Sequence, residues 1–258
     1  MTGIGIGAGL GMLVGHSCIY APGTLSAQFD GVNQYIDFGN NPASTFTIDD
    51  PFTFACWFKT SDANDQALLQ KFSTNGIRFE VTAAGRVHVI LFDSIGAGAG
   101  AWLQRYTTAT TYAGGAWHSA AFSYDGSRTV AGLKLFLGGA QPATTGVEHN
   151  PADINLGAGV PLTVSGWLSD RFNGNICHSA VWDIEMTPTN LNTITGAGNP
   201  MNLLGDSACC DFSAGLVHWS TDGDGCAIGA GNCLDISGEV DHGTYTNSDG
   251  TDFVLDYP

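Results

Sequence analysis

The stretch FTFACWFKT, Phe52–Thr60, decides the fold class because apolar side chains recur at every second position. Residues i and i+2 of a β-strand point to the same face of the sheet. One face would carry Phe52, Phe54, Cys56 and Phe58, and the other Thr53, Ala55, Trp57 and Lys59. The alternation therefore predicts a β-strand with one strongly apolar face.

The same alternation recurs along the chain, in GIRFEVTAAGRVHVILF (76–92), AWHSAAFSYDG (116–126) and GLKLFLGG (132–139). Turn signals separate these runs, namely Asp30-Gly31, Asn75-Gly76, Ala84-Gly85, Asp125-Gly126, Gly138-Gly139 and Asn173-Gly174. Short strands between frequent turns predict an antiparallel β-sandwich over residues 25–196. We expect its core to include Phe29, Phe54, Trp57, Phe79, Trp117, Phe122, Leu135, Phe172 and Trp182. One short helix is expected after Thr187, which can cap it, with Pro188 at the first helical position.

The composition narrows the class of partner. The 258 residues include 24 acids and 8 bases, for a net charge of −16, and no Lys or Arg follows Arg171. Nucleic acid and anionic membranes both attract a basic surface, so neither is an expected partner. The amino-acid composition changes to small and acidic residues near 196–200, and we therefore predict an acidic extension over residues 197–258.

The seven cysteines are an odd number, which excludes a complete set of intramolecular disulfides. We expect mostly reduced, structural thiols, with Cys56 and Cys177 inside strands. The alternative is a disulfide or zinc site among Cys209, Cys210, Cys226 and Cys233, of which Cys226 and Cys233 best suit a local disulfide.

The opening MTGIGIGAGLGM has a glycine at every second position from Gly3 to Gly11. A dinucleotide loop needs a preceding strand, and a signal peptide needs a basic start, yet the first basic residue is Lys59. Alternate glycines do not suit a membrane-spanning helix. We expect residues 1–24 to form an extended assembly arm in which Ile4 and Ile6 contact another subunit.

Four ordered stretches resemble the laminin-G-like family, whose fold is the concanavalin A-like jelly roll. They are LSAQFDGVNQYIDFG (25–39), FTFACWFKT, AWHSAAFSYDG with GLKLFLGG, and RFNGNICHSAVWDIEMTPTNLNTI (171–194). The resemblance covers about residues 25–196 and implies a jelly-roll sandwich. Gly138 and Asn173 stand where the family commonly has Asp, so the family's calcium site is not carried over to them.

The ending GLVHWSTDGDG, LDISGEVDHGTYTN and TDFVLDYP resembles the segment that follows such jelly rolls in structural proteins of tailed bacteriophages. This resemblance implies a non-enzymatic virion protein on the particle surface, a capsid decoration or a tail or fibre component. It would be made in the host cytoplasm. Its partners would be other virion proteins, further copies of the chain and host surface glycans. The alternative is a secreted or surface-displayed lectin or adhesin.

Catalysis is not expected. Glycosidases of this fold carry acids at alternate strand positions. Asp183 and Glu185 have that spacing, but Val181 occupies the place of a third acid. The seven histidines are scattered without an evident carboxylate partner, and no nucleophile elbow is present.

Two stretches of the sequence suggest binding sites. Asp222 and Asp224 could hold a structural calcium ion, although Cys226 and Cys233 fall where an EF-hand-like loop needs oxygen ligands, so a plain turn is favoured. We expect no other cofactor. Trp102, Tyr106 and Tyr112 have the amphipathic rings that suit saccharides, and the alternative is that they pack between sheets.

Overall fold

The computed structural model describes residues 25–93, 100–156, 159–166, 170–204, 212–222, 232–237, 242–248, 252–256 and 258. The expected arm with Ile4 and Ile6 lies outside these residues. So do Asp224 and four cysteines, Cys18, Cys209, Cys210 and Cys226.

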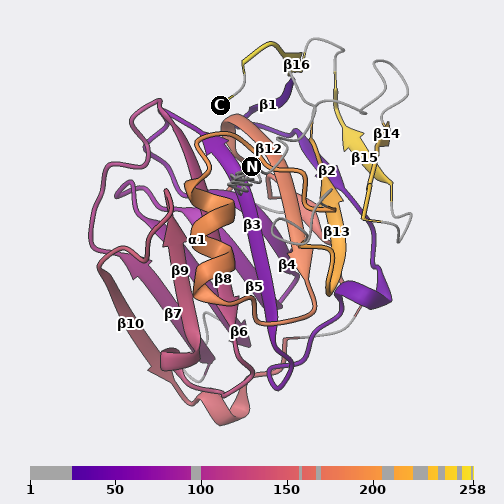
Figure 1. The fold of residues 1–258 in the computed structure, drawn as a ribbon. Coiled ribbons are helices and arrows are strands. Elements are labelled where there is room, and N and C mark those ends of the chain that lie inside the picture. The colour runs from indigo at the N-terminus through magenta and orange to yellow at the C-terminus, as the bar shows by residue number, and fades with distance from the viewer. Residues whose placement is uncertain are drawn as a thin grey trace, which may run out of the picture.

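Two antiparallel sheets form the molecule, as the sequence predicted (Figure 1). The first, with seven strands, has the order β16 (Phe253–Val254), β1 (Ser26–Asp30), β12 (Asn173–Trp182), β3 (Phe52–Lys59), β8 (Trp117–Tyr124) and β9 (Leu133–Leu137), while β13 (Leu216–Ser220) also pairs with β12. Two one-turn 3-10 helices, η1 (Pro42–Ser44) and η2 (Val130–Gly132), precede β3 and β9.

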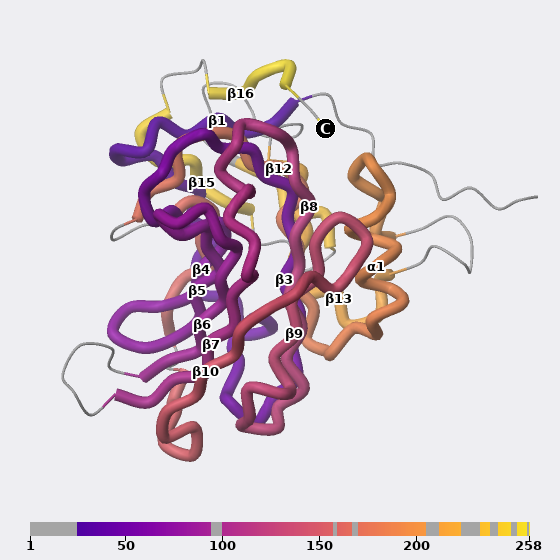
Figure 2. The backbone as a smooth tube through the Cα atoms, turned by 90° about the vertical axis from the view of Figure 1, so that its left-hand side faces the viewer, coloured from indigo at the N-terminus to yellow at the C-terminus, as the bar shows by residue number. Residues whose placement is uncertain are grey.

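The second sheet has nine strands. Their order is β10 (Thr144–His149), β7 (Ala101–Thr107), β6 (Val87–Asp93), β5 (Asn75–Val81), β4 (Gln66–Phe72), β11 (Thr163–Val164), β2 (Tyr35–Asp37), β15 (Gly243–Thr246) and β14 (Asn232–Cys233). A third 3-10 helix, η3 (Pro151–Asp153), follows β10. Figure 2 shows the sheets edge-on, with the helix α1 on the outer side of the seven-stranded sheet.

The single α-helix of the described residues is α1, Pro188–Gly196, as predicted. Oγ1 of Thr187 accepts a hydrogen bond from the backbone N–H of Asn190 at 3.2 Å, and Pro188 occupies the first turn. This cap satisfies one of the N–H groups that a helix start leaves without a partner.

The core between the sheets is built largely from aromatic rings. Phe54 of β3 stacks on Phe122 of β8, with ring centroids 5.1 Å apart, and Phe79 of β5 meets Phe122 edge-on at 5.2 Å. All three are fully buried. Truncating Phe122 to alanine would cost about 3–5 kcal/mol.

Strand β3 is buried on both faces. Its four alternate residues Phe52, Phe54, Cys56 and Phe58 belong to the core between the sheets, as predicted. Ala55 on the opposite face belongs to a second cluster, which α1 and the chain after it form with Trp182. The helix and the C-terminal segments therefore cover the outer face of this sheet.

One prediction about packing and one about turns were wrong. Trp117 is only half-buried, because it lies at the start of β8 where its Nε1–H donates to Asp256 Oδ1 at 3.1 Å.

Asn75-Gly76 and Asn173-Gly174 begin strands β5 and β12 instead of forming separate turns. Gly174 has a φ of +143°, and a Cβ there would lie 2.1 Å from the carbonyl oxygen of Lys59. Glycine is needed at this position for close strand approach.

Of the three described cysteines, two are reduced as predicted, and the third fits the disulfide alternative. Cys56 and Cys177 are buried free thiols in β3 and β12. Cys233 in β14 is disulfide-bonded, which supports the alternative of a disulfide in the C-terminal group. Its partner is not among the described residues.

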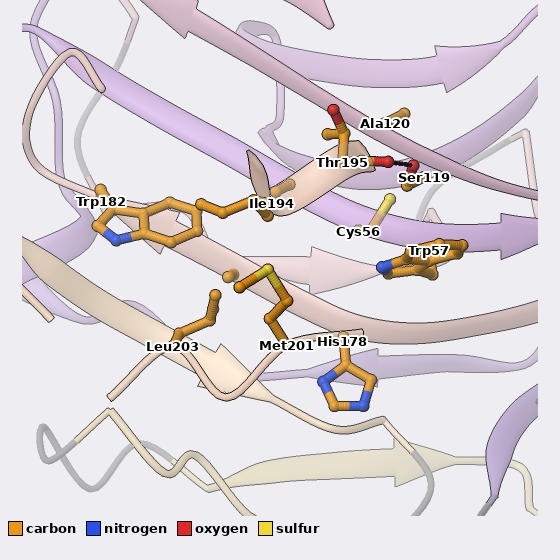
Figure 3. Close-up of a pocket in the computed structure, with 12 residues that line it drawn as sticks. Cys56, Trp57, Ser119, Ala120, His178, Trp182, Ile194, Thr195, Met201 and Leu203 are labelled. Carbon is orange, nitrogen blue, oxygen red and sulfur yellow. Dashed lines mark hydrogen bonds between the residues drawn. The ribbon is translucent and has the colours of Figure 1, made fainter. Parts of the chain in front are cut away.

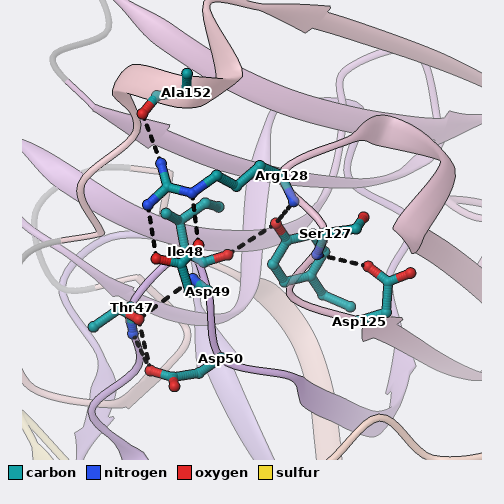
Figure 4. Close-up of polar contacts among 9 residues, drawn as sticks. Thr47, Ile48, Asp49, Asp50, Asp125, Ser127, Arg128 and Ala152 are labelled. Carbon is teal, nitrogen blue, oxygen red and sulfur yellow. Dashed lines mark hydrogen bonds and ion pairs between the residues drawn. The ribbon is translucent and has the colours of Figure 1, made fainter.

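One end of the sandwich is held by a polar cluster around Arg128 (Figure 4). Nε and Nη2 of Arg128 donate to the two carboxylate oxygens of Asp49 at 2.6 and 2.8 Å, and Nη1 donates to the carbonyl of Ala152 at 2.6 Å. The fork therefore joins the turn before β3, the turn after β8 and η3. Bidentate geometry of this kind fixes orientation well.

The C-terminal segments contribute to both sheets. β13 pairs with β12 and β16 with β1 in one sheet, and β15 pairs with β2 in the other. Asp256 Oδ2 accepts from Lys59 Nζ at 2.6 Å, and its backbone carbonyl accepts from Ser26 Oγ at 2.6 Å. The part of the chain that is described contains no helix long and apolar enough to cross a membrane.

Candidate functional site

The outer face of the nine-stranded sheet, across β4, β5, β6, β7 and β10, is the candidate site. Strand alternation sends every second side chain of β7 to this face, namely Trp102, Gln104 and Tyr106. Cross-strand register then sets their neighbours in three rows. Row one is Phe72, Gly76, Phe92, Trp102 and His149; row two is Gln70, Arg78, Ile90, Gln104 and Val147; row three is Glu80, His88, Tyr106 and Thr145.

The first row is aromatic. Trp102 stacks on the imidazole of His149, with ring centroids 4.5 Å apart and planes inclined by 23°. Phe72 and Phe92 lie 5.5 Å apart and form a small apolar cluster with Ile90, against which Trp102 packs. Trp102 itself is half-buried. The row thus presents a fixed indole at the surface.

The third row is polar and internally connected. His88 Nδ1 lies 2.7 Å from Glu80 Oε1, and its Nε2 lies 3.2 Å from Gln104 Oε1. The guanidinium of Arg86 lies over the ring of Tyr106, 5.2 Å from its centroid. These contacts hold hydrogen-bonding side chains in fixed positions beside the aromatic row.

Charges on the face are paired. Arg78 Nη2 contacts the carboxylates of both Glu80, at 2.5 Å, and Asp170. The same guanidinium lies 5.4 Å from the ring centroid of Phe72. A face whose ions neutralise one another suits an uncharged ligand better than an ionic one.

Several buried polar atoms of this face have no hydrogen-bond partner in the described part of the chain. They include Oε1 and Nε2 of Gln70 and Nε1 of Trp102. Gln70 is completely buried. Each buried polar group without a partner lowers the stability of the folded state by about 1–3 kcal/mol. Native proteins therefore contain few such groups, and those that remain often have a functional reason.

The structure separates the three aromatic residues predicted to contact a saccharide. Trp102 and Tyr106 share the outer face as expected from their spacing. Tyr112 does not join them: it lies in the loop after β7, edge-on to His118 at 5.2 Å, and packs against the core from the other end. Of the three residues, only Tyr112 therefore packs against the core between the sheets, and it is only partly buried.

The candidate acids Asp183 and Glu185 lie beyond β12, not on a strand. Asp183 is exposed, and Glu185 accepts from Lys134 Nζ at 2.6 Å. Val181 is fully buried in the core between the sheets. The two acids are therefore not arranged along one face of a cleft.

The calcium candidate Asp222 is completely buried, and its Oδ2 accepts from the backbone N–H of Ser179 at 2.7 Å. Burial raises the pKa of Asp222, although hydrogen bonds from Ser179 and the charge of His218 act against it. This hydrogen bond joins Asp222, which follows β13, to β12. Within the described ranges, no three His, Cys, Asp or Glu side chains are grouped as a metal site.

Two histidines do have carboxylate partners, contrary to the expectation from sequence. His88 contacts Glu80, and His218 Nδ1 lies 3.8 Å from Asp235 Oδ2. Burial opposes ionisation of Asp235, but hydrogen bonds and charge from His218 prevail and lower its pKa to about 2. Neither pairing is visible from sequence spacing, because each depends on strand register.

Sequence reasoning missed most of the site. Gln70, Arg78, Glu80, His88 and His149 belong to it and were not singled out. The available signal was the polar residue at alternate positions of otherwise apolar runs, such as His88 in VHVILF.

Comparison with solved structures gives the same fold. A protein from Bacteroides ovatus, assigned provisionally as a carbohydrate binding protein, matches with a TM-score of 0.56 and 17% identity over 89% of this chain and 59% of that one. The chain thus spans 59% of the length of that structure. Domain 4 of the extracellular arabinanase AbnA from Geobacillus stearothermophilus, solved with arabinotriose, has a TM-score of 0.48 and 17% identity over 70% of this chain and 82% of that one. The likeness to the Bacteroides ovatus protein concerns the fold alone.

The family is identified by one of the two sequence comparisons. No curated protein matched the chain. The profile of the concanavalin A-like lectin/glucanases superfamily matches residues 30–192, which is more than half of the sequence. This confirms the laminin-G-like resemblance seen in the four ordered stretches. The chain belongs to the concanavalin A-like lectin/glucanases superfamily.

Proposed function

We propose that this protein binds neutral oligosaccharides on the outer face of the nine-stranded sheet, without catalysis. The observation that carries the proposal is the half-exposed indole of Trp102, which is fixed by its stack on His149 and whose buried Nε1 has no hydrogen-bond partner in the described residues. Sugar rings have apolar faces that stack on aromatic rings and hydroxyl edges that supply hydrogen bonds.

The arrangement of β7 suggests the size of the ligand. Trp102 and Tyr106 lie four residues apart on the same face, roughly 13 Å along the strand. A single pyranose ring cannot contact both. We therefore expect oligosaccharides to bind more tightly than their component monosaccharides.

The unpartnered atoms give the ligand a source of favourable energy. In the free protein Gln70 and Trp102 Nε1 are shielded from water. The proposal includes a small movement of neighbouring side chains that lets sugar hydroxyls reach them. A hydrogen bond made to such a group recovers the desolvation cost already present in the free protein.

A panel of neutral oligosaccharides titrated into the full chain tests the proposal. We expect binding that falls at least tenfold in Trp102→Ala, because the stacking platform is lost. Val32→Ala, at a 72% exposed turn position far from the face in sequence and sheet order, is the folded control and should bind normally. Equal binding by Trp102→Ala and the wild type would contradict the site, and no binding to any sugar would contradict the function.

A structural role in a bacteriophage virion is the second proposal, and the observation behind it is the C-terminal resemblance. Within that C-terminal region, LVHWS forms β13 and GTYT forms β15, one strand in each sheet. Such a role is compatible with glycan binding at a particle surface. Copurification of the protein with intact particles at fixed copy number would support this role, and its absence from purified particles would refute it.

A further inference from the structure

A cavity of about 440 Å³ lies at the C-terminal end of α1, on the side of the molecule that the helix covers. Its walls come from β3, β8, the turn after β9, the helix end and the last residue of the chain. The lining side chains that matter are Trp57, Tyr112, Trp117, His118 and Pro258. The volume falls within the roughly 300–1,000 Å³ of ligand pockets.

The walls are aromatic. Trp57 and Trp117 belong to neighbouring strands, and Tyr112 lies edge-on to His118. Two further lining residues, Gly138 and Gly198, have no side chain, and no atom lies within 4 Å of a Cβ added at either, so the space beside them is open. Aromatic walls around an open space favour a ligand with flat apolar faces.

Among the described residues, those that line the cavity include no charged side chain. Burial lowers the pKa of His118, so its imidazole is neutral near pH 7. Its Nε2 is a buried atom with no hydrogen-bond partner in the described ranges. Burial raises the pKa of Tyr112, so its hydroxyl stays protonated and available to donate. An uncharged ligand with hydroxyl groups matches this lining.

A second, much smaller cavity of about 20 Å³, drawn in Figure 3, shares Trp57, Ser119 and Thr195 with the first. Ser119 Oγ donates to the carbonyl of Thr195. The smaller cavity is lined mainly by apolar groups such as Ile194 and Met201. It has room for about one water or methyl group and for no ring. A ring must therefore stay in the larger cavity.

The tail of the chain completes the outer wall. Asp256 accepts from both Trp117 Nε1 and Lys59 Nζ, which places Pro258 at the cavity. The Lys59–Asp256 ion pair also neutralises the nearest charges. The cavity thus depends on contacts between the C-terminal tail and the strands β3 and β8.

We propose that this cavity is a second binding site, which takes a single uncharged sugar ring between Trp57, Tyr112 and Trp117. It shares a ligand class with the outer face of the nine-stranded sheet but no residue, so either site can be absent while the other is present. The ring stacks on the indoles, and its hydroxyls meet the hydroxyl of Tyr112.

The test follows the indole N–H signals of Trp57, Trp117 and Trp102 in ¹⁵N NMR spectra of the full chain. The probes are glucose, galactose, mannose and N-acetylglucosamine, each up to about 100 mM, which would saturate a site with a millimolar Kd. We expect at least one sugar to shift the Trp57 and Trp117 signals saturably. Tyr112→Ala should weaken this response at least tenfold, while Trp102→Ala should leave it intact.

The outcomes separate the two proposals. If oligosaccharides shift Trp102 but none of the four sugars shifts Trp57 or Trp117, the cavity proposal is wrong and the proposed function stands. If the reverse holds, the cavity stands and the outer-face site is wrong. If a proline-rich peptide shifts Trp57 and Trp117 and no sugar does, the cavity is a peptide site and the proposal is overturned. Thermal unfolding of Tyr112→Ala shows whether the variant is folded. If it is misfolded, the response of the wild-type Trp57 and Trp117 signals to the sugars decides the proposal.

Discussion

Gln66 and Gln70 lie four residues apart on β4 and are both completely buried, yet their amide groups are in opposite states. Oε1 of Gln66 accepts from Thr60 Oγ1 and from the N–H of Asn173, and its Nε2 donates to the carbonyl of Asp62 at 2.9 Å. Neither polar atom of Gln70 has a partner in the described part of the chain. One glutamine holds the fold together, and the other carries an unrecovered desolvation cost at the candidate site.

Replacing each glutamine by leucine should therefore change stability in opposite directions. Gln70→Leu removes two unpartnered polar atoms, and we expect the free energy of unfolding to rise by about 1–3 kcal/mol. Gln66→Leu leaves buried partners without hydrogen bonds and should lower it by about 3 kcal/mol. Urea unfolding of both variants measures the difference. Destabilisation by Gln70→Leu as large as that by Gln66→Leu would show that Gln70 is structural.

Gly174 should tolerate no side chain. In Gly174→Ala the new Cβ would lie 2.1 Å from the carbonyl oxygen of Lys59, so β12 and β3 would have to separate. We expect a loss of about 3 kcal/mol or more. Gly39→Ala is the control, because its φ of +73° carries strain but no atom lies within 4 Å of the added Cβ. Its loss should be about 1–2 kcal/mol. Equal losses in thermal unfolding would exclude the close approach as the cause.

His178 should make the protein less stable as the pH falls below neutrality. Burial lowers its pKa from 6.5 to about 3, so the unfolded chain binds a proton that the folded protein does not. Between these values stability falls with decreasing pH, by up to about 1.4 kcal/mol per unit from this group. His178 has a φ of +53°, which asparagine also adopts readily, so His178→Asn keeps the backbone and removes the titration. Between pH 6.5 and 5 the free energy of unfolding should change less steeply with pH in the variant than in the wild type. An equal slope would show that His178 does not cause this pH dependence.

The C-terminal tail should detach in acid and in one specific variant. The hydrogen bond from Lys59 lowers the pKa of Asp256, so the ionised anchor persists at neutral pH and is lost as the pH falls below the ordinary Asp range. Asp256→Asn should raise hydrogen exchange at residues 253–256 without unfolding the sandwich. Leu255→Ala changes an 84% exposed neighbour and should leave exchange as it was. Equal exchange in both variants would show that Asp256 does not hold the tail.

The fold could be predicted because its decisive signals are local. Alternation in FTFACWFKT placed Phe54 and Cys56 in the core, and the Thr187-Pro188 pair located the start of α1. Core and cap positions depend on strand period and on chain neighbours, both of which are visible in the sequence. The same reasoning explains the error at Trp117, because alternation does not reveal that a strand end reaches solvent and the tail.

The site could be predicted only in part because it is assembled by register. Trp102 and Tyr106 share a face through strand alternation alone, but His149 reaches Trp102 only through pairing of β10 with β7. Pairing of β4 with β5 likewise places Gln70 opposite Arg78. Such cross-strand relationships depend on how distant segments align, which no local pattern specifies.

The central claim is that a saccharide occupies the outer face of the nine-stranded sheet and reaches the unpartnered indole N–H of Trp102. The most direct measurement is the Nε1–H signal of Trp102 in the ¹⁵N spectrum of the full chain at saturation with a bound oligosaccharide. We predict a shift of that proton, slower exchange with solvent, and loss of oligosaccharide binding in Trp102→Ala but not in Val32→Ala. An oligosaccharide that binds tightly while the Trp102 signal stays unchanged would contradict the account.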